Sequence, residues 1–322
     1  MPPRFLLLYN QFPYDYRNIG EMTRDLSRIS SMGFNAVWIN PIQKTEIGAH
    51  PVNWLKGKHT GSLYAMHDPD RIDEAFRVSE REEDNTATLQ LYTHTACEHY
   101  LTPIFDLVLN QVALDCVLCK VHPDWFKPSV HFGKGCLDFN YDNGDIEAEI
   151  ITFWKGYIDK YILIYGFMGV RVDAVKHVPI RVQRVLYEHI WQRCDEKYKV
   201  APIIFAELLL SPDECGMLDS LIAELRDARV THITHVTNTA YWDVTRREQR
   251  RIPGFLDDMG KKSQIAPTVG FAASHDTLTL YGSLIESLAR QETLAEKHIQ
   301  MQKFMRICQD IYTEIMEKLR IE

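Results

Sequence analysis

Charged side chains follow several apolar segments of this chain, and two of them stand two residues apart. Arg171 and Asp173 alternate with small apolar residues in the segment 169–175, which places both side chains on the same face of a short strand. Burying these charges without a purpose would be costly. We expect Arg171 to keep Asp173 ionised, because a nearby opposite charge favours the charged form. An ionised carboxylate at the end of a strand suits a covalent nucleophile, although a structural ion pair is equally compatible with this segment alone.

Three other apolar segments also end in polar side chains. These polar ends are Asp106 with Asn110 and Gln111, then Glu207, and finally His275 with Asp276. In a closed parallel barrel the C-terminal ends of the strands meet at one mouth, where the active sites of such barrels lie. Two carboxylates facing each other across a sugar would suit glycoside chemistry, one as nucleophile and one as acid/base. Glu207 follows an apolar strand, where desolvation raises a carboxyl pKa and keeps the group protonated.

Alternating strands and helices must position these side chains. Apolar runs predict strands at 5–12, 34–39, 100–110, 169–175, 202–208, 230–236 and 268–273. Helical spacing predicts helices at 19–32, 85–99, 146–165, 180–198 and through most of 277–322. Since the first five strands are apolar on both faces and alternate with helices, we expect a parallel sheet covered by helices. No eighth apolar strand with turn signals follows the seventh in the sequence.

Composition narrows the class of protein. The chain has 322 residues and a formal net charge of -8, which argues against nucleic acid or an anionic membrane surface as the main partner. No apolar run is long enough to span a membrane, and residues 1–9 are too short for a signal sequence. The 7 cysteines form no evident disulfide framework and fit a reducing compartment. We therefore expect a cytoplasmic protein, although export by a route without a signal peptide would leave no trace in the sequence.

Four short segments, in order, resemble the four sequence regions of the α-amylase family, a large (β/α)8 group that acts on α-glucosidic bonds. The segments are residues 106–111, 169–177, 205–207 and 271–276, and 169–177 is the most similar of them. Residues 61–68 resemble the family loop whose aromatic side chain, here Tyr64, stacks on the reacting sugar. The resemblance covers about residues 5–285. It implies an α/β fold of the (β/α)8 TIM-barrel type, in one catalytic domain over residues 1–322 with a short insert at about 111–144 after the third strand.

The resemblance also implies roles for individual residues. Asp173 resembles the nucleophile, Glu207 the acid/base, and Asp276 the third carboxylate, which binds sugar hydroxyls. The other residues expected at the substrate are Arg171, His275, Tyr64, Asp106, Asn110, Gln111, Lys176 and His177. The family usually has His where this chain has Gln111, and a glutamine can still hydrogen-bond a sugar hydroxyl.

The chain departs from the family pattern in two further ways. The insert at 111–144 is short beside the family's calcium-binding subdomain, so we expect no cofactor, with Asn110 as the candidate ligand if calcium is retained. The sequence also lacks the family's eighth strand and C-terminal β-sandwich, which implies a barrel truncated at its C-terminus with an open strand edge. Residues 277–322 or a second copy of the chain, in a homodimer, would have to cover that edge.

These observations lead to one main hypothesis and two alternatives. The main hypothesis is a retaining enzyme that hydrolyses or transglycosylates α-1,4-glucosidic bonds of an α-glucan or maltooligosaccharide by double displacement. The first alternative is a maltosyl- or 4-α-glucanotransferase, since parts of the insert resemble the maltosyltransferase branch. The second is a non-catalytic glucan-binding protein derived from the same barrel. The presence of Asp173, Glu207 and Asp276 favours catalysis.

Overall fold

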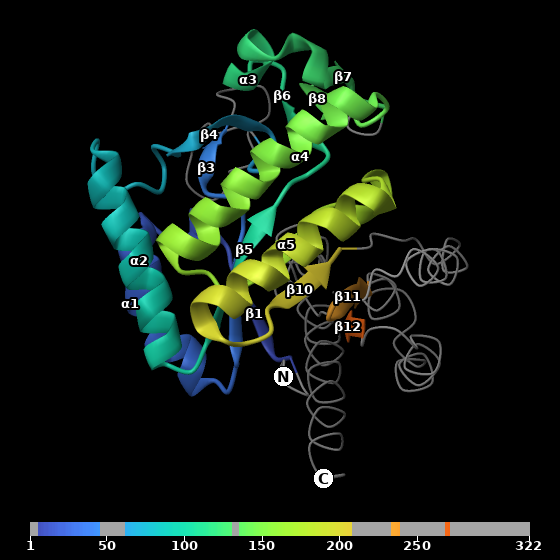
Figure 1. Ribbon diagram of the computed structural model, residues 1–322. Helices are drawn as coiled ribbons and strands as arrows, with labels where there is room; N and C mark the ends of the chain where they lie inside the picture. The colour runs from blue at the N-terminus through green and yellow to red at the C-terminus, as the bar shows by residue number, and fades with distance from the viewer. Residues whose placement is uncertain (1–5, 46–61, 131–134, 208–232, 239–267, 271–322) are drawn as a thin grey trace, which may run out of the picture. The chain divides into compact units, whose positions relative to one another are not determined.

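The computed structural model describes residues 6–45, 62–130, 135–207, 233–238 and 268–270. The chain divides into two compact units, residues 1–208 with 223–236 and residues 209–222 with 237–322. The first unit contains the elements that position the candidate site (Figure 1). In the second unit the described element is the strand β12 (Thr268–Gly270). A single catalytic domain over 1–322 stays a prediction.

A parallel sheet forms the centre of the first unit. Its strands, in spatial order, are β1 (Leu8–Gln11), β2 (Ala36–Ile39), β5 (Thr102–Leu107), β9 (Gly169–Val172), β10 (Ile203–Ala206) and β11 (His235–Asn238). Every neighbouring pair is parallel. Strands β2, β9 and β10 are buried at every residue, as their apolar sequences require when helices cover the sheet. The predicted parallel sheet is therefore confirmed, although its strands are shorter than the apolar runs that predicted them.

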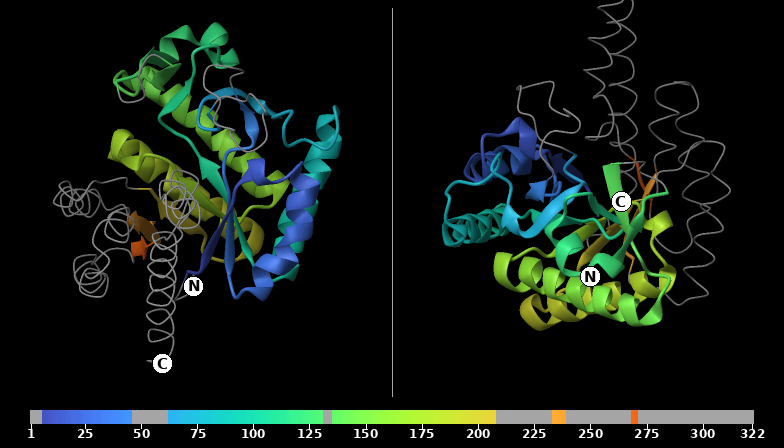
Figure 2. Two further views of the ribbon diagram at one scale, coloured as in Figure 1. Left: turned by 180° about the vertical axis from the view of Figure 1, so that it is seen from behind. Right: turned by 90° about the horizontal axis from the view of Figure 1, so that it is seen from above.

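Four long helices cover the outer face of this sheet (Figures 1 and 2). They are α1 (Ile19–Ser31), α2 (Glu82–Glu98), α4 (Gly144–Asp159) and α5 (Ile180–Tyr198). Helix α1 begins after Asn18, whose side chain accepts a hydrogen bond from the Glu21 N–H and so caps the helix. Its buried residues recur at helical spacing and pack inward: Ile19, Met22, Thr23, Leu26 and Ile29. Shorter helical segments are η1 (Pro13–Asp15), α3 (Val117–Val121), η2 (Pro123–Trp125), the π-helix η4 (Lys160–Tyr165) and η5 (Val175–His177).

Two small antiparallel sheets lie beyond the C-terminal ends of the central strands (Figure 1). One pairs β3 (Gln43–Thr45) with β4 (Met66–Ile72). The other has the order β6 (Gln111–Ala113), β8 (Cys136–Phe139) and β7 (Phe126–Pro128). None of the strands predicted from the sequence lies in either sheet, because strands this polar show no clear period. The second sheet gives the predicted insert a scaffold of its own.

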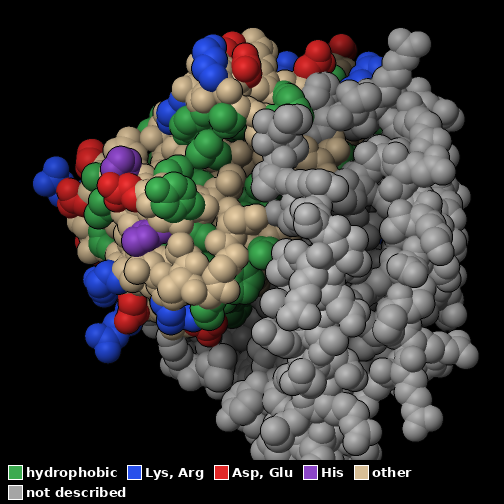
Figure 3. Space-filling view, turned by 90° about the horizontal axis from the view of Figure 1, so that it is seen from below, with side chains coloured by type: hydrophobic (Ala, Val, Ile, Leu, Met, Phe, Trp, Pro, Cys, Tyr) green, Lys and Arg blue, Asp and Glu red, His purple; other side chains and the backbone are tan. Residues whose placement is uncertain are grey.

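The described strands form an open sheet, and no closed barrel is seen within the described ranges. The predicted helical tail at 277–322 lies outside the described residues, so the covering of the open edge and the homodimer stay predictions. At the N-terminal ends of the strands, acidic and basic side chains alternate around the rim of the described part (Figure 3). None of the helices described is long and apolar enough to cross a membrane.

Close packing at the start of β9 yields a testable prediction. A Cβ added at Gly169 would lie 2.7 Å from the Ile203 carbonyl oxygen and 3.2 Å from Cγ1 of Ile104, so the two adjacent strands leave no room for it. We expect Gly169→Ala to lower the free energy of unfolding by about 1–3 kcal/mol through overpacking, measured by urea denaturation.

The matched control is Gly156→Ala in helix α4, where nothing lies within 4 Å of the added Cβ. This change should raise the free energy of unfolding by about 0.5–1 kcal/mol, because alanine loses less backbone freedom in a helix. Equal effects of the two substitutions would contradict the packing described for β9.

Candidate active site

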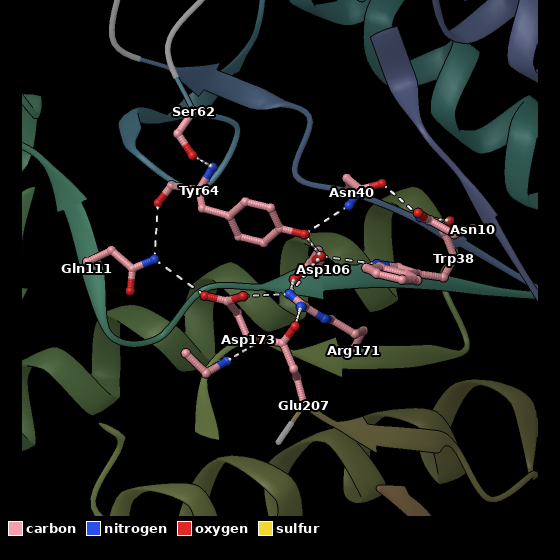
Figure 4. Close-up of polar contacts among 11 residues, drawn as sticks. Asn10, Trp38, Asn40, Ser62, Tyr64, Asp106, Gln111, Arg171, Asp173 and Glu207 are labelled. Atoms are coloured by element: carbon pink, nitrogen blue, oxygen red, sulfur yellow. Dashed lines mark hydrogen bonds and ion pairs between the residues drawn. The ribbon is translucent and has the colours of Figure 1, made fainter. Parts of the chain in front are cut away.

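The buried guanidinium of Arg171 lies at the centre of the candidate site. Its Nη1 is 2.9 Å from Oδ1 of Asp106 and 2.6 Å from Oδ1 of Asp173. Its Nη2 donates to Oε1 of Glu207 (Figure 4). All four residues are almost fully buried, with Arg171 1% exposed, Asp106 3%, Asp173 6% and Glu207 5%. One cation therefore binds three carboxyl groups inside the protein.

The register of three adjacent strands brings these groups together. Asp106 on β5 stands opposite Arg171 on β9, and Arg171 stands opposite Phe205 on β10. The pairing continues past the strand ends, where the Asp173 N–H donates to the Leu107 carbonyl at 3.0 Å and the Glu207 N–H donates to the Val172 carbonyl at 2.9 Å. The carboxylates thus come from three consecutive strands at the same edge of the sheet. The structure brings together the predicted nucleophile, the predicted acid/base and two residues predicted to bind substrate.

The chain turns sharply directly after Asp173. Ala174 has φ 46° and ψ 44°, a left-handed conformation that costs an L-residue roughly 1–2 kcal/mol. In this conformation its N–H donates to Oε2 of Glu207 at 3.0 Å. The predicted strand 169–175 therefore ends at Val172, and the strained turn supplies a second donor to the candidate acid/base. Lys176 and His177 follow on η5 and are half-buried.

Two aromatic rings flank the guanidinium. Cζ of Arg171 lies 5.0 Å from the ring centroid of Trp38 and 5.3 Å from that of Tyr64, both within cation–π range. Both side chains also donate to Oδ2 of Asp106, Trp38 through Nε1 at 3.1 Å and Tyr64 through its hydroxyl at 3.0 Å. Tyr64 was predicted to stack on sugar, and one of its ring faces is directed at Arg171. Sequence reasoning missed Trp38, although it is the one aromatic residue in an otherwise aliphatic strand, followed two residues later by Asn40.

Gln111 links the insert sheet to the candidate nucleophile. Its Nε2 donates to Oδ2 of Asp173 at 3.3 Å and to the Tyr64 carbonyl at 3.4 Å. Its Oε1 is buried and finds no hydrogen-bond partner in the described part of the chain. Gln111 therefore contacts Asp173 directly, which the sequence did not predict.

The candidate calcium ligand Asn110 is engaged within the protein. Its Nδ2 donates to Oδ1 of Asp138 on β8 at 3.1 Å. Within the described ranges, no group of three or more His, Cys, Asp or Glu side chains could hold a metal ion. The absence of a cofactor therefore stays a prediction, with Asn110 as the candidate ligand if calcium is retained. Two further predicted site residues, His275 and Asp276, lie outside the described residues.

The electrostatics of the site differ from the sequence-based expectation. Burial raises the pKa of Asp173; the positive charge of Arg171 opposes this rise, and the charge of Asp106 adds to it. Although burial alone would lower the pKa of Arg171, Asp106 and Glu207 raise it well above its usual range. We expected Arg171 to keep Asp173 ionised; Arg171 does lower this pKa, but the effect of burial is larger and the net shift of the pKa is upward. The physical reason is that desolvation of the buried carboxyl group outweighs the attraction of Arg171, a cation that two other carboxyl groups also share.

This pKa shift makes stability depend on pH in a definite direction. Because the pKa of Asp173 is raised in the folded protein, folding favours its protonated form, and this contribution is lost as pH rises from about 3.8 through the folded pKa. We expect Asp173→Asn, which mimics the protonated form, to melt at a higher temperature than the unmodified protein at pH 7. The difference should shrink as pH falls and vanish below about pH 3.8, as measured by thermal denaturation across this range. A variant that melts lower at pH 7 would contradict the assigned direction.

Part of the sequence is similar to a known protein. No protein-family model matches the chain. Alpha-amylase 3 of Schizosaccharomyces pombe (strain 972 / ATCC 24843) is 26% identical over 185 residues, which is 47% of this chain and 29% of that protein. The chain therefore matches less than a third of this curated relative's length.

Solved structures resemble the chain over more of its length. The maltogenic α-amylase AmyB of Thermotoga neapolitana has a TM-score of 0.64 at 20% identity, covering 88% of this chain and 64% of that one. An α-amylase of Lactobacillus plantarum has a TM-score of 0.61 at 20% identity, covering 85% and 64%. Both similar structures are (β/α)8 barrels of the α-amylase type. The chain is thus similar in part of its sequence to an α-amylase, and it shares the fold of these solved α-amylase structures.

Proposed function

We propose that this chain is a retaining enzyme that cleaves α-1,4-glucosidic bonds of an α-glucan by double displacement. The observation that carries this proposal is the placement of Asp173 and Glu207 on one buried guanidinium, at the ends of adjacent strands. Retaining glycosidases use two carboxyl groups close together, one as nucleophile and one as acid/base. The relationship to the α-amylase family supports the choice of α-glucosidic bonds.

In the first half-reaction, a carboxylate oxygen of Asp173 attacks the anomeric carbon of the sugar as the bond to the leaving oxygen breaks. Glu207 gives its proton to that oxygen, so the departing sugar leaves with a neutral hydroxyl. The product is an ester between Asp173 and the sugar. In the second half-reaction, Glu207 takes a proton from water or from a sugar hydroxyl, whose oxygen attacks the anomeric carbon and releases Asp173. Two inversions leave the configuration unchanged.

The burial that raises the pKa of Asp173 serves this chemistry. In the free protein the ionised carboxylate is poorly solvated and shares Arg171 with two other carboxyl groups. In the transition state the sugar carries positive charge beside Asp173, and this charge stabilises the Asp173 carboxylate. Fixed charges act strongly in a site without bulk water, so the arrangement favours the transition state over the ground state. Arg171 also orients both reacting carboxyl groups by direct hydrogen bonds.

The chemistry of the acceptor separates hydrolysis from transfer. The same ester is released by water in a hydrolase and by a sugar hydroxyl in a glucanotransferase. Chromatography of the products from soluble starch and from pure maltooligosaccharides decides between them, since transfer alone gives products longer than the starting oligosaccharide. Binding without any product would favour the non-catalytic glucan-binding alternative.

Removal of the nucleophile tests the central assignment. We expect Asp173→Asn to lower kcat by roughly 10⁴-fold or more, because the ester can no longer form. Oligosaccharide affinity, measured by calorimetry, should change little, since stacking and hydroxyl contacts remain. The matched control is Asp142→Asn, an exposed carboxylate paired with Lys127 in the insert, which should leave kcat unchanged. Near-normal turnover by Asp173→Asn would show that another group is the nucleophile.

The stereochemistry of the product tests the mechanism independently of any substitution. Proton NMR during the first minutes of maltooligosaccharide cleavage should show the α-anomer forming first and the β-anomer appearing only by mutarotation. If the β-anomer forms first, the enzyme inverts configuration, and Asp173 and Glu207 would need different roles.

A further inference from the structure

A chain of side-chain hydrogen bonds leads from the first strand of the sheet to the carboxylate cluster. Nδ2 of Asn10 on β1 donates to Oδ1 of Asn40 at 2.8 Å, and Nδ2 of Asn40 donates to the Tyr64 hydroxyl oxygen at 2.8 Å. The Tyr64 hydroxyl in turn donates to Oδ2 of Asp106 at 3.0 Å (Figure 4). We call Asn10, Asn40 and Tyr64 the hydroxyl relay. None of the roles described above uses its two asparagines.

The direction of every bond in this relay is fixed from its ends. Nδ2 of Asn10 also lies 3.4 Å from the Trp38 carbonyl, which can only accept, so this end of the amide is the donor. Asn10 must then donate to Asn40, which leaves the Asn40 amide nitrogen facing the Tyr64 oxygen. Because that oxygen accepts from Asn40, its own proton is free to point at Asp106. Asn40 is fully buried, so water does not compete for its amide group.

The far end of the relay acts on the reacting groups through Asp106. This carboxyl shares Nη1 of Arg171 with Asp173, at 2.9 Å and 2.6 Å. A hydrogen bond from Tyr64 withdraws negative charge from Asp106 and so weakens the attraction between Asp106 and the guanidinium of Arg171. If the tyrosine proton pointed elsewhere, Asp106 would draw Arg171 more strongly and leave Asp173 less well oriented and less well stabilised as an anion.

We propose that Asn10 and Asn40 are positioning residues that direct the Tyr64 hydroxyl toward Asp106, and so set the orientation and charge balance of Arg171 and Asp173. The inference rests on the proposed function for its catalytic consequence, whereas the relay itself is a property of the folded protein. Neither asparagine touches Asp173 or Glu207 through any hydrogen bond described here.

Replacing either amide with a carboxylate should reverse the tyrosine proton. In Asn40→Asp the new side chain accepts from Asn10 with one oxygen and from Tyr64 with the other. In Asn10→Asp the Asn40 amide must turn to donate to the new carboxylate, and its oxygen then accepts from Tyr64. Both variants should lower kcat on the order of tenfold or more with a smaller change in KM, and both should shift the acidic limb of the pH–rate profile upward. The control Asn143→Asp adds the same charge at the exposed N-cap of α4, where aspartate caps equally well, and should change none of these quantities.

The decisive experiment repeats these substitutions in a Tyr64→Phe background, where no hydroxyl remains to be redirected. There Asn40→Asp and Asn10→Asp should each change kcat by less than about twofold, whereas a direct effect of the added charge or a folding defect would persist undiminished. Asn10 is half-buried, so Asn10→Asp serves if the buried Asn40→Asp fails to fold.

Urea denaturation of the same variants provides a readout that requires no catalysis. The urea midpoint should fall for each asparagine substitution alone, and the fall should change when Tyr64 is already phenylalanine, because the altered relay then lacks the tyrosine donor. A coupled midpoint in a protein without glucan activity would uphold the relay and refute the proposed function. Additive changes in both the midpoint and kcat would overturn the relay itself.

Discussion

The rest of the site depends on the buried guanidinium of Arg171, which binds three carboxyl groups and has two aromatic rings against it. If all three carboxylates were ionised, the cluster would carry a net charge of about -2 away from water, which is costly in a medium of low dielectric constant. Removing the partner of a buried charge commonly costs 3–5 kcal/mol, so we expect no other residue type to replace Arg171. The single positive charge of Arg171 therefore limits how many of the three carboxyl groups can be ionised at the same time.

This constraint extends into the backbone. The three carboxyl groups can meet one guanidinium only if β5, β9 and β10 keep their register, and Gly169 permits this because neighbouring strands approach its Cα too closely for a side chain. The left-handed turn at Ala174 directs an N–H at Glu207 at a cost of roughly 1–2 kcal/mol. Local strain is therefore tolerated where it positions the candidate acid/base. At Asp173 the proposed reaction needs the ionised carboxylate, whereas burial in the folded protein favours the protonated form.

The sequence predicted the parts of this arrangement that follow from periodicity and from strand ends. Alternation within 169–175 placed Arg171 and Asp173 together, and the position of Glu207 after an apolar strand placed it beside them. It could not predict the aromatic pair on Arg171, because Trp38 and Tyr64 are far apart in the chain and only the folded register unites them. The net rise in the pKa of Asp173 was not predicted either, because the sequence shows the neighbouring cation but neither the full burial of this carboxyl group nor the charge of Asp106 beside it. The short strands of the insert carry too few residues to show a period.

In the proposed mechanism Asp173, oriented by Arg171, forms a covalent bond to the sugar. Its most direct test is mass spectrometry of the protein after incubation with a fluorinated α-glucosyl fluoride, a probe whose glycosyl-enzyme forms quickly and breaks down slowly. We expect the intact protein to gain the mass of one glycosyl group, and peptide mapping to place the group on Asp173. A label on Glu207 or on another residue, or no label in a protein that still turns over maltooligosaccharides, would contradict it.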